Sequence, residues 1–152
     1  KVFDDPILDG LIAEAAGGLD CPGADLLFIE NVGNLVCTAG FDLGEHLRIV
    51  ALSVPEGDDK VVKYPSIFQR SDALVITKID LLPHCSFDLG RARDDMRRLA
   101  PGARVFEVSV VRDTGLAELA GWLAAKREEV LALARSNPSI KPDLKYELEP
   151  LP

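Results

Sequence analysis

ALVITKID, residues 73–80, decides the fold class, because an apolar run that ends in Thr77 is followed at once by charged residues. A short run that is apolar on both faces is typical of a strand buried in a parallel sheet. Similar runs occur at LLFI (26–29), LRIVALSV (47–54) and ARVFEVSV (103–110). Each is short, contains β-branched residues and is bounded by polar or turn residues, so each predicts a strand.

Helical patterns occur between and around these runs. Residues 5–16 place apolar residues on one face, with Asp5 as an N-cap before Pro6. Residues 88–100 and 114–135 carry apolar stripes at helical spacing. The predicted stripe residues are Leu89, Ala92, Met96 and Leu99, and then Leu116, Leu119, Leu123, Val130 and Leu131. This alternation predicts an α/β domain with a doubly wound, mainly parallel sheet and flanking helices.

The chain of 152 residues is long enough for one domain with its own core. We expect that domain to span residues 1–135. The remaining segment, 136–152, contains four prolines and no apolar period. It is predicted to be an extended or disordered tail.

Composition excludes several classes of partner. A net charge of −8 opposes binding to nucleic acid, and the basic cluster at 91–98 is interrupted by two aspartates. No apolar run approaches the roughly 20 residues that span a bilayer, and no signal pattern opens the chain. Three irregularly spaced cysteines suggest free thiols, so we expect a cytoplasmic protein without a membrane partner.

Polar residues follow the ends of several predicted strands. Glu30 follows LLFI, Lys78 and Asp80 follow ALVIT, and Ser109 lies near the end of ARVFEVSV. In doubly wound domains ligands bind beyond the carboxyl ends of the strands. Loop onsets are also polar in the absence of any ligand, but several such ends together favour a binding site there.

TKID, residues 77–80, resembles the [NT]KxD element of GTP-binding proteins. That resemblance implies that Asp80 accepts hydrogen bonds from guanine N1–H and the exocyclic amine, whereas adenine offers neither donor. The Lys78 stem would cover the base, and Thr77 stands where asparagine is commoner. SVVRDTG, residues 109–115, resembles the loop whose backbone N–H reaches guanine O6, which implies cofactor-binding roles for Ser109 and Val110.

ENVG, residues 30–33, resembles the switch element that senses magnesium and the γ-phosphate. The resemblance implies that Glu30 acts on the metal or its water shell, and that the Gly33 N–H contacts the phosphate. From Asp25 to about Trp122 the chain resembles hydrogenase nickel-insertion GTPases of the HypB type, SIMIBI-class proteins related to the urease factor UreG. Its most specific motif is ENVGNLVC, which ends at Cys37.

The resemblance implies that Cys37 is a nickel or zinc ligand at a dimer interface. A thiolate is a suitable soft ligand for either metal, but a site needs about four donors. Two copies related by a two-fold axis would bring two such thiolates together. For a lone cysteine, a small buried apolar side chain is the simpler alternative. Cys21, His84 and Cys85 are expected to be loop residues, and His46 a solvated one.

The function implied is that of a GTP-binding metallochaperone for nickel insertion into [NiFe] hydrogenase, with GTP hydrolysis coupled to metal transfer. Its cofactors would be GTP, Mg²⁺, and Ni²⁺ or Zn²⁺. Its partners would be the hydrogenase large subunit and other nickel-insertion maturation factors. A homodimer is expected in the GTP state.

One departure from the family pattern is large: neither a GxxxxGK[ST] phosphate loop nor the Cys-His pair of the family occurs in these 152 residues. We therefore expect the C-terminal part of a GTPase domain, which binds GTP poorly and hydrolyses it negligibly. A catalytically silent module that docks on maturation partners is an alternative. A flavodoxin-like or response-regulator-like domain is another, although no acidic pocket with a phosphoacceptor aspartate follows LLFIE.

Overall fold

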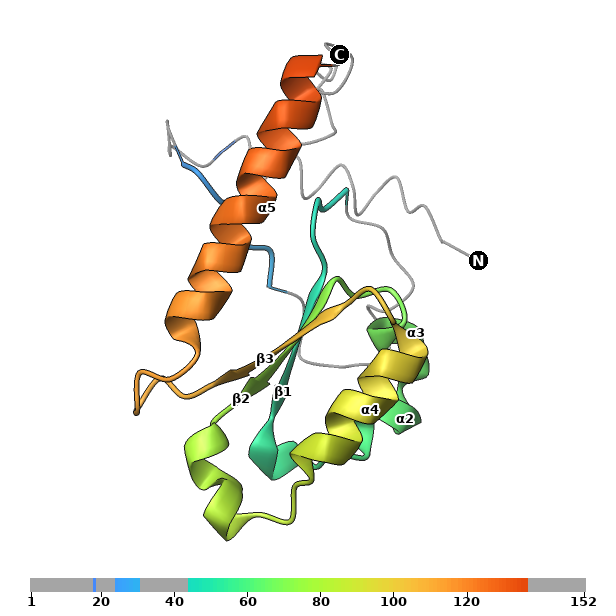
Figure 1. Cartoon of the computed structure of the whole chain (residues 1–152). Helices are drawn as coiled ribbons and strands as arrows, with labels where there is room; N and C mark the ends of the chain where they lie inside the picture. Colours follow the sequence, from blue (N-terminus) through green and yellow to red (C-terminus); the bar gives the residue numbers. More distant parts are fainter. Residues whose placement is uncertain (1–17, 19–23, 31–43, 137–152) are drawn as a thin grey trace.

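The protein is described by a computed structural model, which places residue 18, residues 24–30 and residues 44–136 (Figure 1). Its centre is a parallel sheet in the order β1-β2-β3, formed by β1 (Ile49–Ser53), β2 (Ala73–Thr77) and β3 (Arg104–Val108). Ala51 of β1 pairs with Val75 of β2, which pairs with Phe106 of β3. All carboxyl ends therefore lie at one edge of the sheet.

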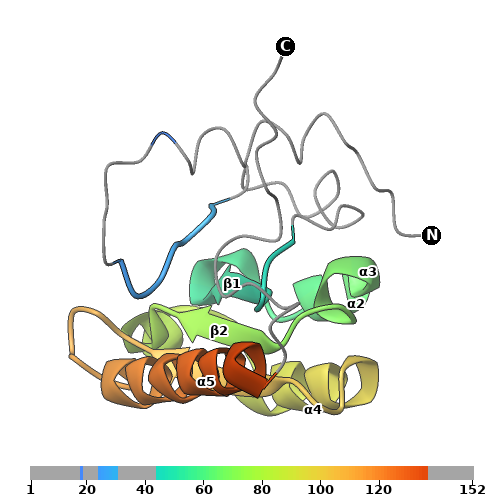
Figure 2. The ribbon, with the colours of Figure 1, turned by 90° about the horizontal axis from the view of Figure 1, so that it is seen from above.

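Helices cover both faces of this sheet. α2 (Lys60–Lys63), α3 (Pro65–Phe68) and α4 (Leu89–Leu99) lie on one side, and α5 (Leu116–Ser136) lies on the other (Figures 1 and 2). A 3₁₀ segment, η1 (Val54–Glu56), follows β1 directly, and a second, η2 (Ile79–His84), begins one residue after β2. The predicted class, a parallel α/β sheet with flanking helices, is confirmed.

The alternation of side chains along the strands produces two apolar clusters. On the face under α2, α3 and α4, Leu52, Leu74 and Ile76 are fully buried with Met96 of α4. On the other face, a cluster that includes Phe106 packs against α5, and the rings of Phe106 and Trp122 are 5.3 Å apart. The sheet is thus fixed between its helices, which holds the strand ends in place.

Local signals explain the boundaries of α4. Asp88 is its N-cap, and the carboxylate oxygen Oδ1 accepts the Arg91 N–H at 3.0 Å. The helix ends at Leu99, just before Pro101. The predicted stripe faces the core: Ala92 and Met96 are fully buried, while Leu89 and Leu99 pack against the same cluster.

One predicted strand is wrong. Residues 24–30 form no regular element, and the side chains of Leu26 to Ile29 are between 37% and 70% exposed. A strand in a parallel sheet needs a hydrogen-bonded neighbour, and these residues pair with none of β1, β2 and β3. Among the described residues, a salt bridge from Asp25 to Arg127 of α5 holds the segment.

The short helices between β1 and β2 were not predicted, because four-residue turns carry no apolar period. The helix predicted at 5–16 lies outside the described residues, and so does the predicted tail 136–152 except for Ser136, which is the last residue of α5. Within the described part of the chain, no helix is long and apolar enough to cross a membrane.

Candidate functional site

The carboxyl ends of β2 and β3 bring Asp80 and Ser109 together. Ser109 follows β3 and is fully buried, and its hydroxyl donates to Asp80 Oδ1 over 2.5 Å. The pair joins positions 29 residues apart in the sequence. One oxygen of the Asp80 carboxylate is thereby oriented, while the group as a whole stays partly accessible.

Lys78, between β2 and Asp80, has a left-handed backbone with φ 58° and ψ 40°. This conformation is uncommon for a residue with a side chain and often marks a constrained turn or a functional site. The residue is exposed and immediately precedes η2. The turn at Lys78 thus carries the chain from β2 directly to Asp80.

The pKa of Asp80 lies below its ordinary value. The hydrogen bond from the Ser109 hydroxyl is the main cause, and burial opposes it. A backbone hydrogen bond and the positive charges of Arg112 and Lys78 lower the pKa of Asp80 further. The site therefore holds an ionised acceptor.

The loop from Ser109 to Gly115 is closed tightly. Ser109 and Thr114 exchange both backbone hydrogen bonds at 3.0 Å, and Asp113 takes a positive φ of 50°. Gly115 has φ +73°, and a Cβ there would lie 2.0 Å from the Glu107 carbonyl oxygen. Only glycine fits that position.

Two valines project from this loop. Val110 is 78% exposed and Val111 is 87% exposed. They directly follow Ser109, the partner of Asp80, in the chain. Such exposure is unusual for adjacent β-branched apolar residues. The Val110 N–H, for which the resemblance to GTP-binding proteins implies a contact with guanine O6, belongs to this loop.

The other predicted site residues are not joined to this pair. Glu30 is exposed in the irregular segment 24–30 and has no hydrogen bond or salt bridge among the described residues. The convergence predicted for it relied on a strand at 26–29, which the structure does not contain. Gly33, Cys37 and Cys21 lie outside the described residues. Thr77 is the partly buried last residue of β2.

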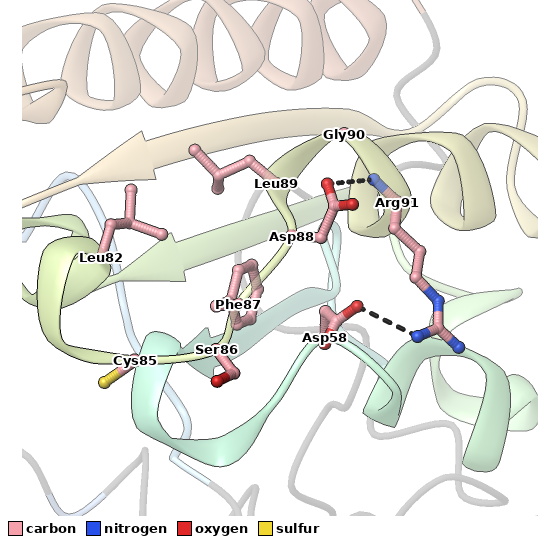
Figure 3. Close-up of a pocket in the computed structure, with 9 residues that line it drawn as sticks. All are labelled: Asp58, Leu82, Cys85, Ser86, Phe87, Asp88, Leu89, Gly90 and Arg91. Atoms are coloured by element: carbon pink, nitrogen blue, oxygen red, sulfur yellow. Dashed lines mark hydrogen bonds and ion pairs between the residues drawn. The ribbon is translucent and has the colours of Figure 1, made fainter.

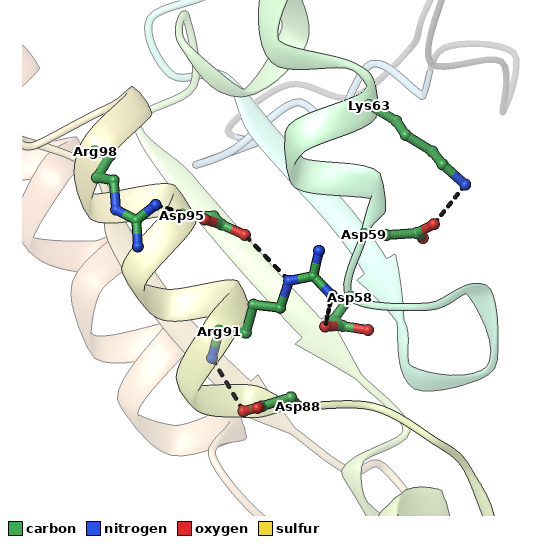
Figure 4. Close-up of polar contacts among 7 residues, drawn as sticks. All are labelled: Asp58, Asp59, Lys63, Asp88, Arg91, Asp95 and Arg98. Atoms are coloured by element: carbon green, nitrogen blue, oxygen red, sulfur yellow. Dashed lines mark hydrogen bonds and ion pairs between the residues drawn. The ribbon is translucent and has the colours of Figure 1, made fainter.

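A second polar cluster links the loop after β1 to α4 (Figure 4). Arg91 lies between two carboxylates, with Nη1 3.3 Å from Asp58 and Nε 3.8 Å from the buried Asp95. Arg98 pairs with the other Asp95 oxygen at 3.3 Å. These contacts fix the loop that follows η1 against the helix.

Beside this cluster lies an open depression of about 730 Å³ (Figure 3). Asp58, Phe87 and Asp88 line it, with the partly buried Cys85 at its margin. Among the described residues, no group of three or more His, Cys, Asp or Glu side chains is placed to hold a metal ion. His84 and Cys85 therefore form no such group with any described neighbour.

Sequence reasoning missed two features of the site. The left-handed turn at Lys78 has no sequence signal, because lysine does not favour that conformation. Arg112 lies close to Asp80 through Ser109, since its N–H donates to the Ser109 hydroxyl at 3.2 Å. The closeness of Arg112 to Asp80 could have been expected, because Arg112 is a cation in the loop after β3 and that loop lies at the sheet edge that carries Asp80.

Comparisons with known proteins agree with this architecture. No protein-family model matches the chain. The hydrogenase maturation factor HypB of Azotobacter vinelandii is 44% identical over 117 residues, which are 77% of this chain and 39% of that relative.

Two solved structures are also similar. HypB from Archaeoglobus fulgidus is 40% identical with a TM-score of 0.66, over 68% of this chain and 51% of that one. HypB from Helicobacter pylori, in complex with nickel, is 41% identical with a TM-score of 0.69, over 78% of this chain and 54% of that one. The chain thus spans about two fifths of the length of the Azotobacter relative. It belongs to the HypB family of hydrogenase maturation factors.

Proposed function

We propose that this chain carries the guanine-recognition part of a GTP-binding factor that acts in the nickel step of hydrogenase maturation. The observation that supports it is the ionised Asp80, oriented by the buried Ser109 hydroxyl at adjacent strand ends. The pair lies at the edge of a parallel sheet where ligands of such domains bind. The same motifs, TKID and SVVRDTG, resemble the base-binding elements of GTP-binding proteins.

Asp80 selects the base by its chemistry. An ionised carboxylate only accepts hydrogen bonds, and guanine offers two adjacent donors, N1–H and the exocyclic amine. Adenine has an unprotonated ring nitrogen and no amine at the corresponding positions, so it would leave the carboxylate unsatisfied. The Lys78 stem covers one face of the base, and Thr77 leads into the turn that positions it.

Nucleotide titrations of the chain, followed by amide NMR, test this proposal. Guanosine monophosphate (GMP) should shift the signals of residues 77–80 and 109–112, whereas adenosine monophosphate should not. Monophosphates suit the chain because most triphosphate affinity comes from a phosphate loop, and no such motif occurs in its sequence. Equal shifts with both nucleotides would contradict guanine selection.

The rest of the proposed cycle concerns residues away from this pair. The exposed Glu30 carboxylate is free of protein partners among the described residues and has the oxygen chemistry that Mg²⁺ prefers. We assign it to the Mg²⁺ ion or its water shell, and the Gly33 N–H to the γ-phosphate. Hydrolysis would then proceed by attack of a positioned water on that phosphate. The chain as given should turn GTP over negligibly.

The metal cargo is assigned to Cys37, whose thiolate would bind Ni²⁺ or Zn²⁺ as part of a site shared by two copies. GTP-dependent dimerisation would change the separation of the two thiolates and so couple nucleotide state to metal transfer. The client would be the hydrogenase large subunit, reached together with other nickel-insertion factors. The nickel complex of the Helicobacter pylori relative supports the choice of metal.

A binding module without GTPase activity is the second candidate. GTP turnover by the purified chain would count against it. Such a module would dock on maturation partners without discriminating guanine from adenine. Guanine-selective shifts at residues 77–80 would therefore contradict it.

A further inference from the structure

Arg112 lies in the loop after β3, three residues beyond Ser109, and has no part in the function proposed above. Its backbone N–H donates to Ser109 Oγ at 3.2 Å, and that hydroxyl donates to Asp80 Oδ1 at 2.5 Å. Two successive hydrogen bonds therefore hold the Arg112 backbone near the carboxylate. Its long side chain ends in a planar fork of N–H donors.

The charge of Arg112 also acts at this site. The Ser109 hydrogen bond is the main cause of the lowered pKa of Asp80, and the positive charges of Arg112 and Lys78 add to it. Two cations from different segments thus act on the Asp80 carboxylate: Lys78, which precedes it in the chain, and Arg112 in the loop after β3. Their combined charge favours electron-rich ligand atoms near Asp80.

The guanidinium of Arg112 has no competing carboxylate among the described residues. Several other arginines of the fold differ in this respect, because they form salt bridges with an aspartate or glutamate: Arg91, Arg93, Arg97, Arg98 and Arg104. Arg112 is exposed, and no salt bridge joins it to the neighbouring Asp113. Its donors are available to a ligand.

The loop that carries Arg112 is held by its own hydrogen bonds. The Ser109–Thr114 bridge closes it, the Asp113 N–H donates to the Val110 oxygen at 3.3 Å, and the Thr114 hydroxyl donates to the Arg112 oxygen at 3.3 Å. Little backbone entropy would be lost when the side chain engages a ligand. The arrangement favours a recognition role over a mobile surface cation.

The chemistry of guanine completes the argument. Beside the donors that Asp80 would accept, the base presents O6 and N7, two acceptors in the plane of the ring. Arginine is the side chain that pairs most often with these two atoms, through its parallel N–H groups. Adenine has an amine in place of O6 and would meet the guanidinium donor to donor.

We propose that Arg112 is a second specificity residue of the base site, whose guanidinium donates to the O6 and N7 edge of a guanine held by Asp80. The inference rests on the proposed guanine site and deepens it. Asp80 reads the donors of the base, and Arg112 reads its acceptors. Guanine is the common base that satisfies both.

The test uses the full chain, GMP, and the GMP analogue that lacks N7, with dissociation constants from amide NMR titrations. Arg112→Ala should weaken GMP roughly tenfold and the analogue clearly less, because the analogue has already lost one acceptor. Arg112→Lys keeps the charge but not the planar fork of donors, so its dissociation constant for GMP should lie between those of the alanine variant and the wild type. Arg135→Ala is the matched control: it removes one exposed charge at the far end of α5 and should change neither constant.

Each outcome separates the two proposals. If Arg112→Ala binds GMP as tightly as the wild type does, or if its affinities for GMP and for the analogue without N7 fall by the same factor, the role of Arg112 is overturned. If Asp80→Asn still weakens GMP in that case, the guanine site itself stands. GMP binding that is insensitive to Asp80→Asn, or no GMP-dependent shift in the wild type, overturns the guanine site and the Arg112 proposal together.

Discussion

Gly115 is the residue on which the base-site loop depends most directly, and its replacement gives the sharpest stability prediction. The residue has φ +73°, and an added Cβ would lie 2.0 Å from the Glu107 carbonyl oxygen and 3.2 Å from Val108 Cγ1. The first neighbour is backbone of β3, which cannot rotate away. Gly115→Ala therefore forces either the loop or the end of the strand to move.

The magnitude follows from two costs. The left-handed backbone costs an alanine about 1–2 kcal/mol. Displacement of the backbone to relieve the overlap adds about 1–3 kcal/mol, as for an overpacked core. We expect Gly115→Ala to lower the free energy of unfolding by about 2–5 kcal/mol, a large share of the stability of a typical domain.

Urea unfolding, followed by the fluorescence of the single tryptophan, measures this directly, because Trp122 packs on Phe106 of β3. Gly121→Ala is the matched control: it makes the same substitution in α5, where no atom lies within 4 Å of the added Cβ. That variant should gain about 0.5–1 kcal/mol, since alanine favours helix over glycine. A Gly115→Ala variant as stable as the wild type would refute the steric reasoning.

Three further predictions concern the site, the core and the metal. Ser109→Ala should raise the pKa of Asp80, measured by carboxyl NMR, because it removes the hydrogen bond that lowers this pKa. As the pH falls, Asp80 should therefore lose its charge at a higher pH in the variant than in the wild type. Met96→Ala, at a fully buried position, should cost about 2–5 kcal/mol in urea unfolding, whereas Leu133→Ala on the exposed side of α5 should change little. Cys37→Ser should abolish Ni²⁺ binding and metal-dependent dimerisation, while Cys85→Ser keeps both; in the wild type, affinity should rise with pH as the thiol ionises. Metal retained by Cys37→Ser but lost in Cys85→Ser would move the site to the segment after TKID.

The sheet was predictable where its apolar pattern was complete. Residues 73–77 are apolar on both faces except at Thr77, and β2 has those bounds because it is the central strand with a neighbour on each side. The stripe of α4 was equally readable, since Asp88 caps it and Met96 faces the core. Residues 26–29 have the same composition as a strand, but composition cannot supply a hydrogen-bonded neighbour.

The site was predictable in part for a similar reason. Parallel strands end at one edge, so a serine after β3 and an aspartate after β2 were expected to meet, and their hydrogen bond shows that they do. Glu30 was included by the same rule, but residues 26–29 form no strand, so the structure does not join Glu30 to this pair. The left-handed turn at Lys78 has no sequence signal, because lysine does not favour that conformation. The approach of Arg112 to Asp80 depends on loop geometry, although a cation in the loop after β3 could have indicated it.

The central claim, that Asp80 selects guanine, is tested most directly by exchanging its carboxylate for an amide. Titrations of the wild type and Asp80→Asn with guanosine and xanthosine monophosphates would be followed by amide NMR. The wild type should prefer the guanine nucleotide, whose donors match the carboxylate. Asp80→Asn should lose that preference and favour xanthine, because the new amide can donate to the xanthine C2 carbonyl. Unchanged guanine binding in Asp80→Asn would remove Asp80 from the base site and contradict the account.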